Sequence, residues 1–229
     1  MKTRLFSIIM ILILSGSSAI AQFSDNAKMS FGILGGINFQ NLNGKGANGD
    51  KLENDMILGY HAGVNVQIPI APEFFFQPGL LFSTKGAKYS STVLGTTYTS
   101  TTKLTYIEVP LNFVYKGALG SGYVMVGFGP YLGYGIGGKE LTEGGSISLD
   151  RKIKFKSIVE TSDPETVAYY KALDAGANIF AGYEMGSGIF FQLNTQFGLL
   201  KINPEYKDSP EDKSSVKNTG FGLSLGYRF

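Results

Sequence analysis

The feature that most constrains the fold of this chain is an alternation of side-chain character with a period of two residues. From Met29 onward, large apolar side chains alternate with small or polar ones in eight segments. Leu58 and Tyr60, for example, alternate with Gly59 and His61. Successive side chains of a β-strand point to opposite faces, so each segment is predicted to be a strand. The segments are residues 30–40, 56–68, 74–85, 106–116, 124–136, 174–184, 189–199 and 220–229.

The two faces of these segments differ in a way that indicates their surroundings. The apolar face is rich in large aromatic residues, and the other face consists mainly of Gly, Asn, Gln and Ser. A narrow barrel has room inside for small and medium polar side chains, while aromatic rings face lipid. We therefore predict an all-β fold, an eight-stranded antiparallel up-and-down transmembrane β-barrel. A secreted soluble barrel or sandwich remains the alternative, because it alternates in the same way.

Three prolines lie inside predicted strands. Pro78, Pro110 and Pro130 each lack the backbone N–H that a strand donates to its neighbour. A closed barrel has no free edge on which to place them. We expect a local bulge or one missing hydrogen bond at each proline.

The connectors between the predicted strands alternate in length. Residues 69–73, 117–122 and 186–188 are tight connections, whereas residues 41–55, 86–101, 138–173 and 203–218 are long. Short periplasmic turns and long extracellular loops are typical of bacterial membrane barrels. The first strand is therefore predicted to run outward, which leaves both termini in the periplasm.

The long connector 138–173 contains two further signals. Asp163, Pro164 and Glu165 form a helix-start pattern, which predicts a helix through about Leu173. A basic cluster precedes it, and a solvated hairpin is one interpretation of these charges. The other is contact with the anionic headgroups of lipopolysaccharide. The cluster consists of Arg151, Lys152, Lys154 and Lys156.

The N-terminus has the pattern of a secretory signal. Lys2 and Arg4 precede an apolar run over residues 5–14, and small residues follow up to Ala21. The run is too short for a membrane-spanning helix. We expect a signal peptide over residues 1–21 and one barrel domain over residues 22–229. The chain has 20 Lys and Arg, so without Lys2 and Arg4 it keeps 18, against 18 Asp and Glu. A chain with this charge balance lacks the excess of positive charge that nucleic-acid binding requires.

The composition also limits the chemistry. The chain has no Cys, which excludes disulfides and thiol catalysis. With no Cys and a single His, it also lacks the ligands of the common zinc sites. We expect no cofactor, no metal and no catalytic residue. His61 is the starting point of the enzyme hypothesis. Its place in the alternation puts its side chain on the lumen face, however, and no catalytic motif accompanies it. Lys85, Asn112 and Asn178 are predicted to be lumen-facing polar residues as well.

Four charged residues are predicted to form one network inside the barrel. Lys116, Glu184 and Arg228 lie near the periplasmic ends of their strands on the lumen side, and Glu108 is placed above them. Buried charges are tolerated only when they are paired. The network would fill the lumen, and eight strands leave no room for a wide aqueous channel.

Several motifs resemble the PorT-like outer-membrane β-barrel family, often labelled porin family. They are Tyr106-Ile107-Glu108-Val109-Pro110-Leu111, Gly127-Phe128-Gly129-Pro130-Tyr131-Leu132-Gly133, Asp174-Ala175-Gly176 and Gly222-Leu223-Ser224-Leu225-Gly226-Tyr227-Arg228-Phe229. The resemblance covers nearly the whole mature chain and implies residence in the bacterial outer membrane. Tyr227 and Phe229 also resemble the last-strand signal read by the barrel-assembly machinery. The family resemblance supplies no activity.

These observations lead to one expectation about function and two alternatives. We expect a monomeric outer-membrane barrel with a largely plugged lumen and a structural or loop-mediated binding role, surrounded by outer-membrane lipid and lipopolysaccharide. The first alternative is a small-solute porin or a secretion-system-associated barrel. The second is an outer-membrane lipid-modifying enzyme. The partner of the extracellular loops is not named by the sequence.

Overall fold

The eight alternating segments form eight antiparallel strands that close into a barrel. The computed structural model describes residues 28–207 and 212–229, so the signal peptide expected over residues 1–21 lies outside the described residues. The barrel strands are β1 (Ser30–Lys45), β2 (Ile57–Ala71), β3 (Phe74–Val93), β4 (Thr96–Leu119), β5 (Gly122–Gly144), β9 (Leu173–Met185), β10 (Ile189–Gly198) and β12 (Ser215–Arg228).

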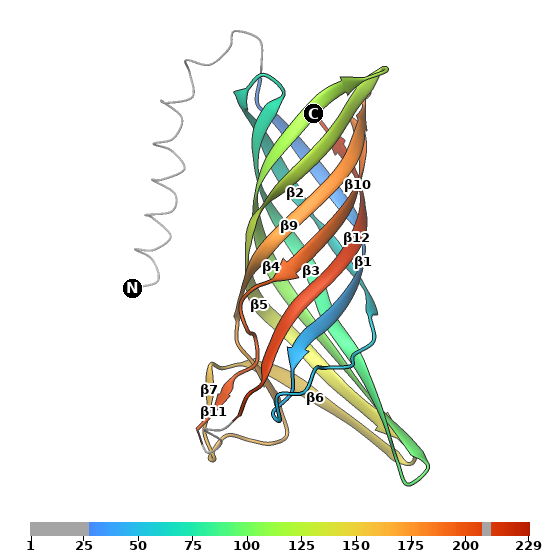
Figure 1. Ribbon diagram of the computed structural model, residues 1–229, viewed down its shortest axis with the longest axis vertical. Coiled ribbons are helices and arrows are strands. Elements are labelled where there is room, and N and C mark those ends of the chain that lie inside the picture. Colours follow the sequence, from blue (N-terminus) through green and yellow to red (C-terminus); the bar gives the residue numbers. More distant parts are fainter. Residues whose placement is uncertain (1–27, 208–211) are drawn as a thin grey trace.

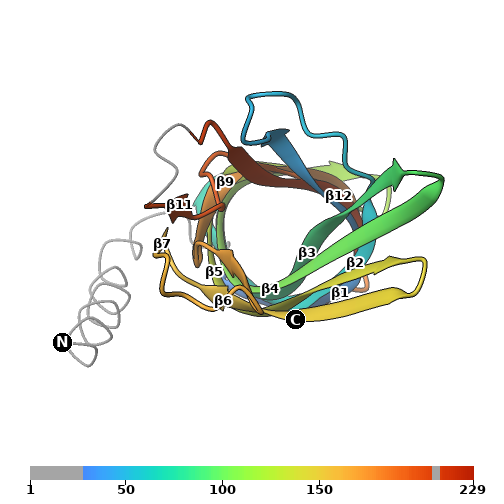
Figure 2. The ribbon, with the colours of Figure 1, turned by 90° about the horizontal axis from the view of Figure 1, so that it is seen from below.

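Each barrel strand pairs with the next barrel strand along the chain, and β12 pairs with β1 to close the ring. This is the predicted up-and-down topology, and Figure 2 shows the ring viewed along its length. No helix within the described ranges is long and apolar enough to cross a bilayer.

The faces are those that the alternation predicts. Phe31, Leu58 and Phe128 point outward and are more than half exposed. The small residues of the other face let lumen side chains pack closely. A Cβ atom on Gly127, for example, would lie 2.3 Å from the ring of Phe180. The aromatic outer surface is therefore the lipid-facing belt of a membrane barrel.

The three strand prolines interrupt the ladder without shifting it. Pairing breaks between β2 and β3 at Pro78, between β3 and β4 at Pro110, and between β4 and β5 at Pro130. The register is the same on both sides of each break, so the prolines produce missing pairs rather than bulges. The pairing of β4 with β5 does contain a bulge, but it lies opposite Thr105 and Tyr106 and not at a proline.

The two ends of the barrel differ as the connector lengths predict (Figure 1). Tight turns join β2 to β3, β4 to β5 and β9 to β10, and the C-terminus lies at the same end, which we call the turn end. The opposite, loop end carries the long connections. Its extra strands are β6 (Ile147–Phe155), β7 (Ile158–Val159), β8 (Ala168–Tyr170) and β11 (Glu205–Tyr206).

The connector over residues 86–101 is not a loop, which corrects the sequence prediction. β3 continues to Val93 and β4 begins at Thr96, with Leu94 and Gly95 in the positive-φ conformations that tight hairpin turns require. β5 and β6 form a second hairpin beside it. Together these strands form the wing, a four-stranded sheet that leans away from the barrel (Figures 1 and 2). The wing comprises residues 86–93, 96–105, 137–144 and 147–155.

The helix predicted from Asp163 to Leu173 is also wrong. Asp163 accepts a hydrogen bond from the backbone N–H of Glu160 (2.8 Å), which precedes it, and so does not cap a helix. Ala168 to Tyr170 instead pair with β6 in parallel. Ala168 and Tyr169 are buried in this arrangement. The tertiary contacts of the segment therefore override its local helix-start signal.

Candidate functional site in the barrel lumen

A cluster of charged side chains closes the lumen near the turn end. Glu184 accepts hydrogen bonds from Lys116 Nζ (2.6 Å) and from Arg228 Nε (3.0 Å), one on each carboxylate oxygen. At most 11% of any of the three side chains is exposed. We call Lys116, Glu184 and Arg228 the turn-end cluster. The structure brings together three of the four residues of the predicted network.

Neighbouring polar and aromatic groups hold the turn-end cluster in place. Arg228 also donates to Asn65 Oδ1 (2.9 Å), and its guanidinium lies 5.2 Å from the ring centre of Phe190. Lys116 Nζ lies 4.8 Å from the ring centre of Tyr123. At the turn end a cavity of about 530 Å³ opens, and Lys116 and Arg228 are among its lining residues. The cluster therefore forms the floor of the turn-end mouth.

A second cluster closes the lumen toward the loop end. Lys85 Nζ lies 2.6 Å from Glu108 Oε1 and 3.0 Å from Asp174 Oδ2, and at most 1% of each side chain is exposed. Tyr131 and Asn218 donate further hydrogen bonds to Asp174 Oδ2, at 3.2 Å and 2.9 Å. We call Lys85, Glu108 and Asp174 the loop-end cluster.

The loop-end cluster corrects the prediction of a single network. Glu108 pairs with Lys85 rather than with the cations of the turn end. Asp174 is a partner that the sequence interpretation missed, although parity puts it on the lumen face of its segment. The sequence pattern gives the face of a residue but not its height along the axis, and height decides which charges meet.

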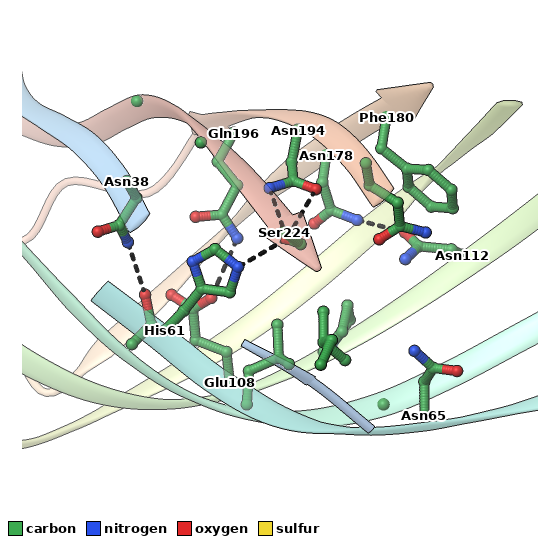
Figure 3. Close-up of a pocket in the computed structure, with 18 of the residues that line it drawn as sticks. Asn38, His61, Asn65, Glu108, Asn112, Asn178, Phe180, Asn194, Gln196 and Ser224 are labelled. Carbon is green, nitrogen blue, oxygen red and sulfur yellow. Dashed lines mark hydrogen bonds between the residues drawn. The ribbon is translucent and has the colours of Figure 1, made fainter. Parts of the chain in front are cut away.

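Between the two clusters lies a small chamber with polar walls (Figure 3). Its free volume is about 80 Å³, enough for a few water molecules. His61 points across it and shares a hydrogen bond of 2.7 Å with Ser224, while Asn112 and Asn178 are hydrogen-bonded to each other. Nine of the residues that line the chamber carry side-chain amides. They are Asn38, Gln40, Asn65, Gln77, Asn112, Asn178, Gln192, Asn194 and Gln196.

An apolar layer covers the loop-end cluster. We call residues 156–172 and 199–207, with β7, β8 and β11, the cap. Ile202 of the cap is fully buried, and Ala168 is nearly so. They pack with Leu42, Leu104 and Tyr106 of the barrel wall. The ring centre of Tyr106 lies 5.5 Å from Lys85 Nζ, so the apolar layer is in direct contact with the charged cluster.

Polar contacts at the loop end tie the cap together. Lys171 N donates to Ile202 O (2.6 Å), and Lys171 Nζ donates to Glu205 (2.9 Å). The backbone N–H of Glu160 and the ammonium of Lys156 hold the pKa of the Asp163 carboxyl below its ordinary value. The cap is thus a folded unit with internal ion pairs.

The structure separates the four residues of the predicted basic cluster. Arg151 is paired with Glu140, and Lys156 is paired with Asp163. Lys152 and Lys154 are exposed on β6, and neither forms an ion pair with any residue that the structure describes. Only these two remain free to meet an external anion.

The C-terminal residues lie on the lipid-facing side of the barrel. Phe229 is 71% exposed, and its ring packs edge-on against Tyr227 at a centre-to-centre distance of 4.9 Å. This placement leaves both rings accessible at the turn end. Their role as an assembly signal stays a prediction.

The described residues contain no group of three or more His, Asp or Glu side chains placed to hold a metal ion. The chemistry of the lumen is that of hydrogen-bonded amides and paired charges. These groups close the barrel on both sides of the small central chamber.

Comparisons with solved structures return small bacterial membrane barrels. Ail of Yersinia pestis, solved with the heparin analogue sucrose octasulfate, is 13% identical over 89% of this chain and 100% of its own, with a TM-score of 0.38. Neisserial surface protein A is 10% identical over 89% and 100%, with a TM-score of 0.43. An outer membrane channel from Pseudomonas putida F1 is 11% identical over 90% and 97%, with a TM-score of 0.30. These likenesses carry no argument about function.

The sequence itself gives the assignment. No curated protein matches it. A family model described as outer membrane protein beta-barrel domain matches residues 20–203, which is most of the chain. The closed ring, the lipid-facing belt and this match agree, and the chain belongs to the outer membrane protein beta-barrel domain family.

Proposed function

We propose that this protein is a non-conducting outer-membrane barrel that works by binding at its loop end. The observation that carries the proposal is the closed lumen. Two buried charge clusters lie one above the other, and the apolar cap lies above both. A solute entering from the turn end meets the turn-end cluster first, then the chamber, then the loop-end cluster.

The loop end supports the binding half of the proposal. Loops that merely join strands need no structure of their own, yet here they build the cap and the wing. Ordered segments outside a rigid scaffold are the usual carriers of binding. We further propose that the protein is PorT-like and monomeric. The motifs around Pro110 and Pro130 support the PorT-like assignment.

We also propose that the protein is not an enzyme. The His61–Ser224 pair is the arrangement that most resembles a catalytic one, since a histidine nitrogen lies 2.7 Å from a serine hydroxyl. Both residues line the chamber. A substrate could reach them only by passing one of the two charge clusters that close the ends of the lumen. The hydroxyl of Ser224 also receives a hydrogen bond from Asn194 (3.1 Å). These contacts support a structural role for the pair.

The test uses the full mature barrel folded in detergent. A mobility shift on a denaturing gel between boiled and unboiled samples shows that the barrel is folded, and planar-bilayer recordings then measure conductance. We expect the shift together with no steady conductance. A steady conductance from shifted, folded protein would overturn the proposal in favour of a small-solute porin.

A further inference from the structure

Three lysines lie side by side across the base of the wing. Lys103 of β4 is directly opposite Lys139 of β5, and Lys139 is directly opposite Lys152 of β6. All three side chains are exposed. Directly opposite residues share a face of the sheet, and adjacent strands are about 4.8 Å apart. We call these residues the lysine row, which spans roughly 10 Å across three strands.

The lysine row lies on the side of the wing that continues the lipid-facing surface. On β4, Lys103 shares its face with Ile107, which is paired with Tyr134 near the loop-end edge of the apolar belt. Ile107 lies four positions after Lys103, which is about 13 Å along the strand. The wing leans away from the barrel axis (Figures 1 and 2). In an outer membrane, the face that continues the lipid-facing surface would then turn toward the membrane surface.

In the described part of the chain, none of the three ammonium groups of the lysine row forms an ion pair. Asp150 and Glu143 lie on the same face but nearer the wing tip, and neither is paired with the row. Like charges directly opposite each other across strands are destabilising.

Two more lysines enlarge the positive surface. Lys88 of β3 and Lys154 of β6 flank the row, on the same face of the sheet. Both are exposed, and neither has an ion-pair partner among residues 28–207 and 212–229. Arg151 lies on the opposite face, where Glu140 neutralises it. The unpaired cations of the wing base are therefore gathered on the face that continues the lipid-facing surface.

We propose that the lysine row binds the phosphate groups of anionic glycolipids in the outer leaflet. Lysines held at a membrane surface attract anionic headgroups, each with an effect of about fivefold in affinity. Three in one row suit a headgroup that carries more than one phosphate. The hydroxyl-rich strands next to the row, with Thr99 and Thr101 on the same face, offer hydrogen-bonding groups to its sugars. This site is independent of whether the lumen conducts.

The test measures binding of bisphosphorylated lipid A to the folded, full-length barrel in neutral detergent micelles. The readout is the rise in unfolding temperature as lipid A is titrated. Changing Lys103, Lys139 and Lys152 together to Gln should weaken the apparent affinity roughly a hundredfold. The matched control is Lys51→Gln, an exposed lysine of the β1–β2 connection outside the wing. It should leave the affinity unchanged.

Comparison ligands and added salt show whether the row recognises the phosphates of a lipid. Dephosphorylated lipid A should bind much more weakly, inorganic phosphate should bind weakly, and added salt should weaken the phosphorylated lipid most. Equal binding of the triple variant, or of dephosphorylated lipid A, would overturn the proposal. So would a soluble sulfated polysaccharide that binds through the row while lipid A does not. If the triple variant does not fold, Lys139→Gln alone should cost about fivefold.

Discussion

Glu184 is the residue on which the turn-end closure depends. Its two oxygens are shared between Lys116 and Arg228, so it is the only carboxylate that pairs with either cation in the described part of the chain. The loop-end cluster has the reverse composition, with Lys85 shared between two carboxylates. In each cluster, the shared residue is the one whose removal leaves two like charges facing each other.

Glu184→Gln should therefore destabilise the barrel. Lys116 and Arg228 would lose the carboxylate that pairs with both of them while staying largely out of water, and breaking a buried pair in this way costs about 3–5 kcal/mol. Urea unfolding in lipid vesicles, followed by gel mobility, measures the loss. The matched control is Glu143→Gln, an exposed wing residue without an ion pair in the described ranges, which should change stability by less than about 0.5 kcal/mol. Equal stability of the two variants would contradict the role assigned to Glu184.

The sequence pattern predicts the face of a residue better than its partners. Parity assigns His61, Lys85, Asn112 and Asn178 to the lumen, and the structure places all four there. Which of them meet depends on strand register and tilt, which the alternation does not contain. Glu108 is the clearest example, since its face follows from parity but its pairing with Lys85 does not.

At the scale of elements, the wing and the cap were beyond the sequence pattern for different reasons. The strands of the β3–β4 hairpin are polar on both faces, so no apolar alternation marks them. Cross-strand hydroxyl pairs such as Ser90–Thr99 (3.1 Å) and Thr92–Thr97 (3.0 Å) join them instead. The cap has a clear local helix signal that pairing with β6 overrides. The barrel strands, in contrast, are predictable because each has one lipid-facing side.

The cap should depend on Ile202 as its anchor. Ile202 is fully buried, and its backbone bonds to Lys171 and Val216, so Ile202→Ala should cost about 2–5 kcal/mol of cap stability while the barrel stays folded. Limited proteolysis of the folded protein should then cleave within residues 156–172, with the gel shift retained. Leu200→Ala, at a neighbouring site that is 42% exposed, is the control. Unchanged resistance of the Ile202 variant would show that the cap is held by other contacts.

At the scale of the whole molecule, the closures of the lumen act in series. The turn-end cluster contains two cations and one carboxylate, and the loop-end cluster contains one cation and two carboxylates. Each carries one uncompensated charge, and the two charges are of opposite sign on either side of the polar chamber. The lumen is thereby neutral as a whole, with a field directed along its axis.

Closures in series predict how conductance responds to substitution. Glu184→Ala, Lys85→Ala and Ile202→Ala each loosen one layer, and the other two still block the path, so no single variant should conduct. The variant carrying all three should pass ions, because every layer then contains water-accessible space. Planar-bilayer recordings, made on each variant after the gel shift confirms folding, test this directly. Steady conductance from any folded single variant would mean that one layer alone closes the barrel, and a silent, folded triple variant would mean that the wall side chains of the chamber close it as well.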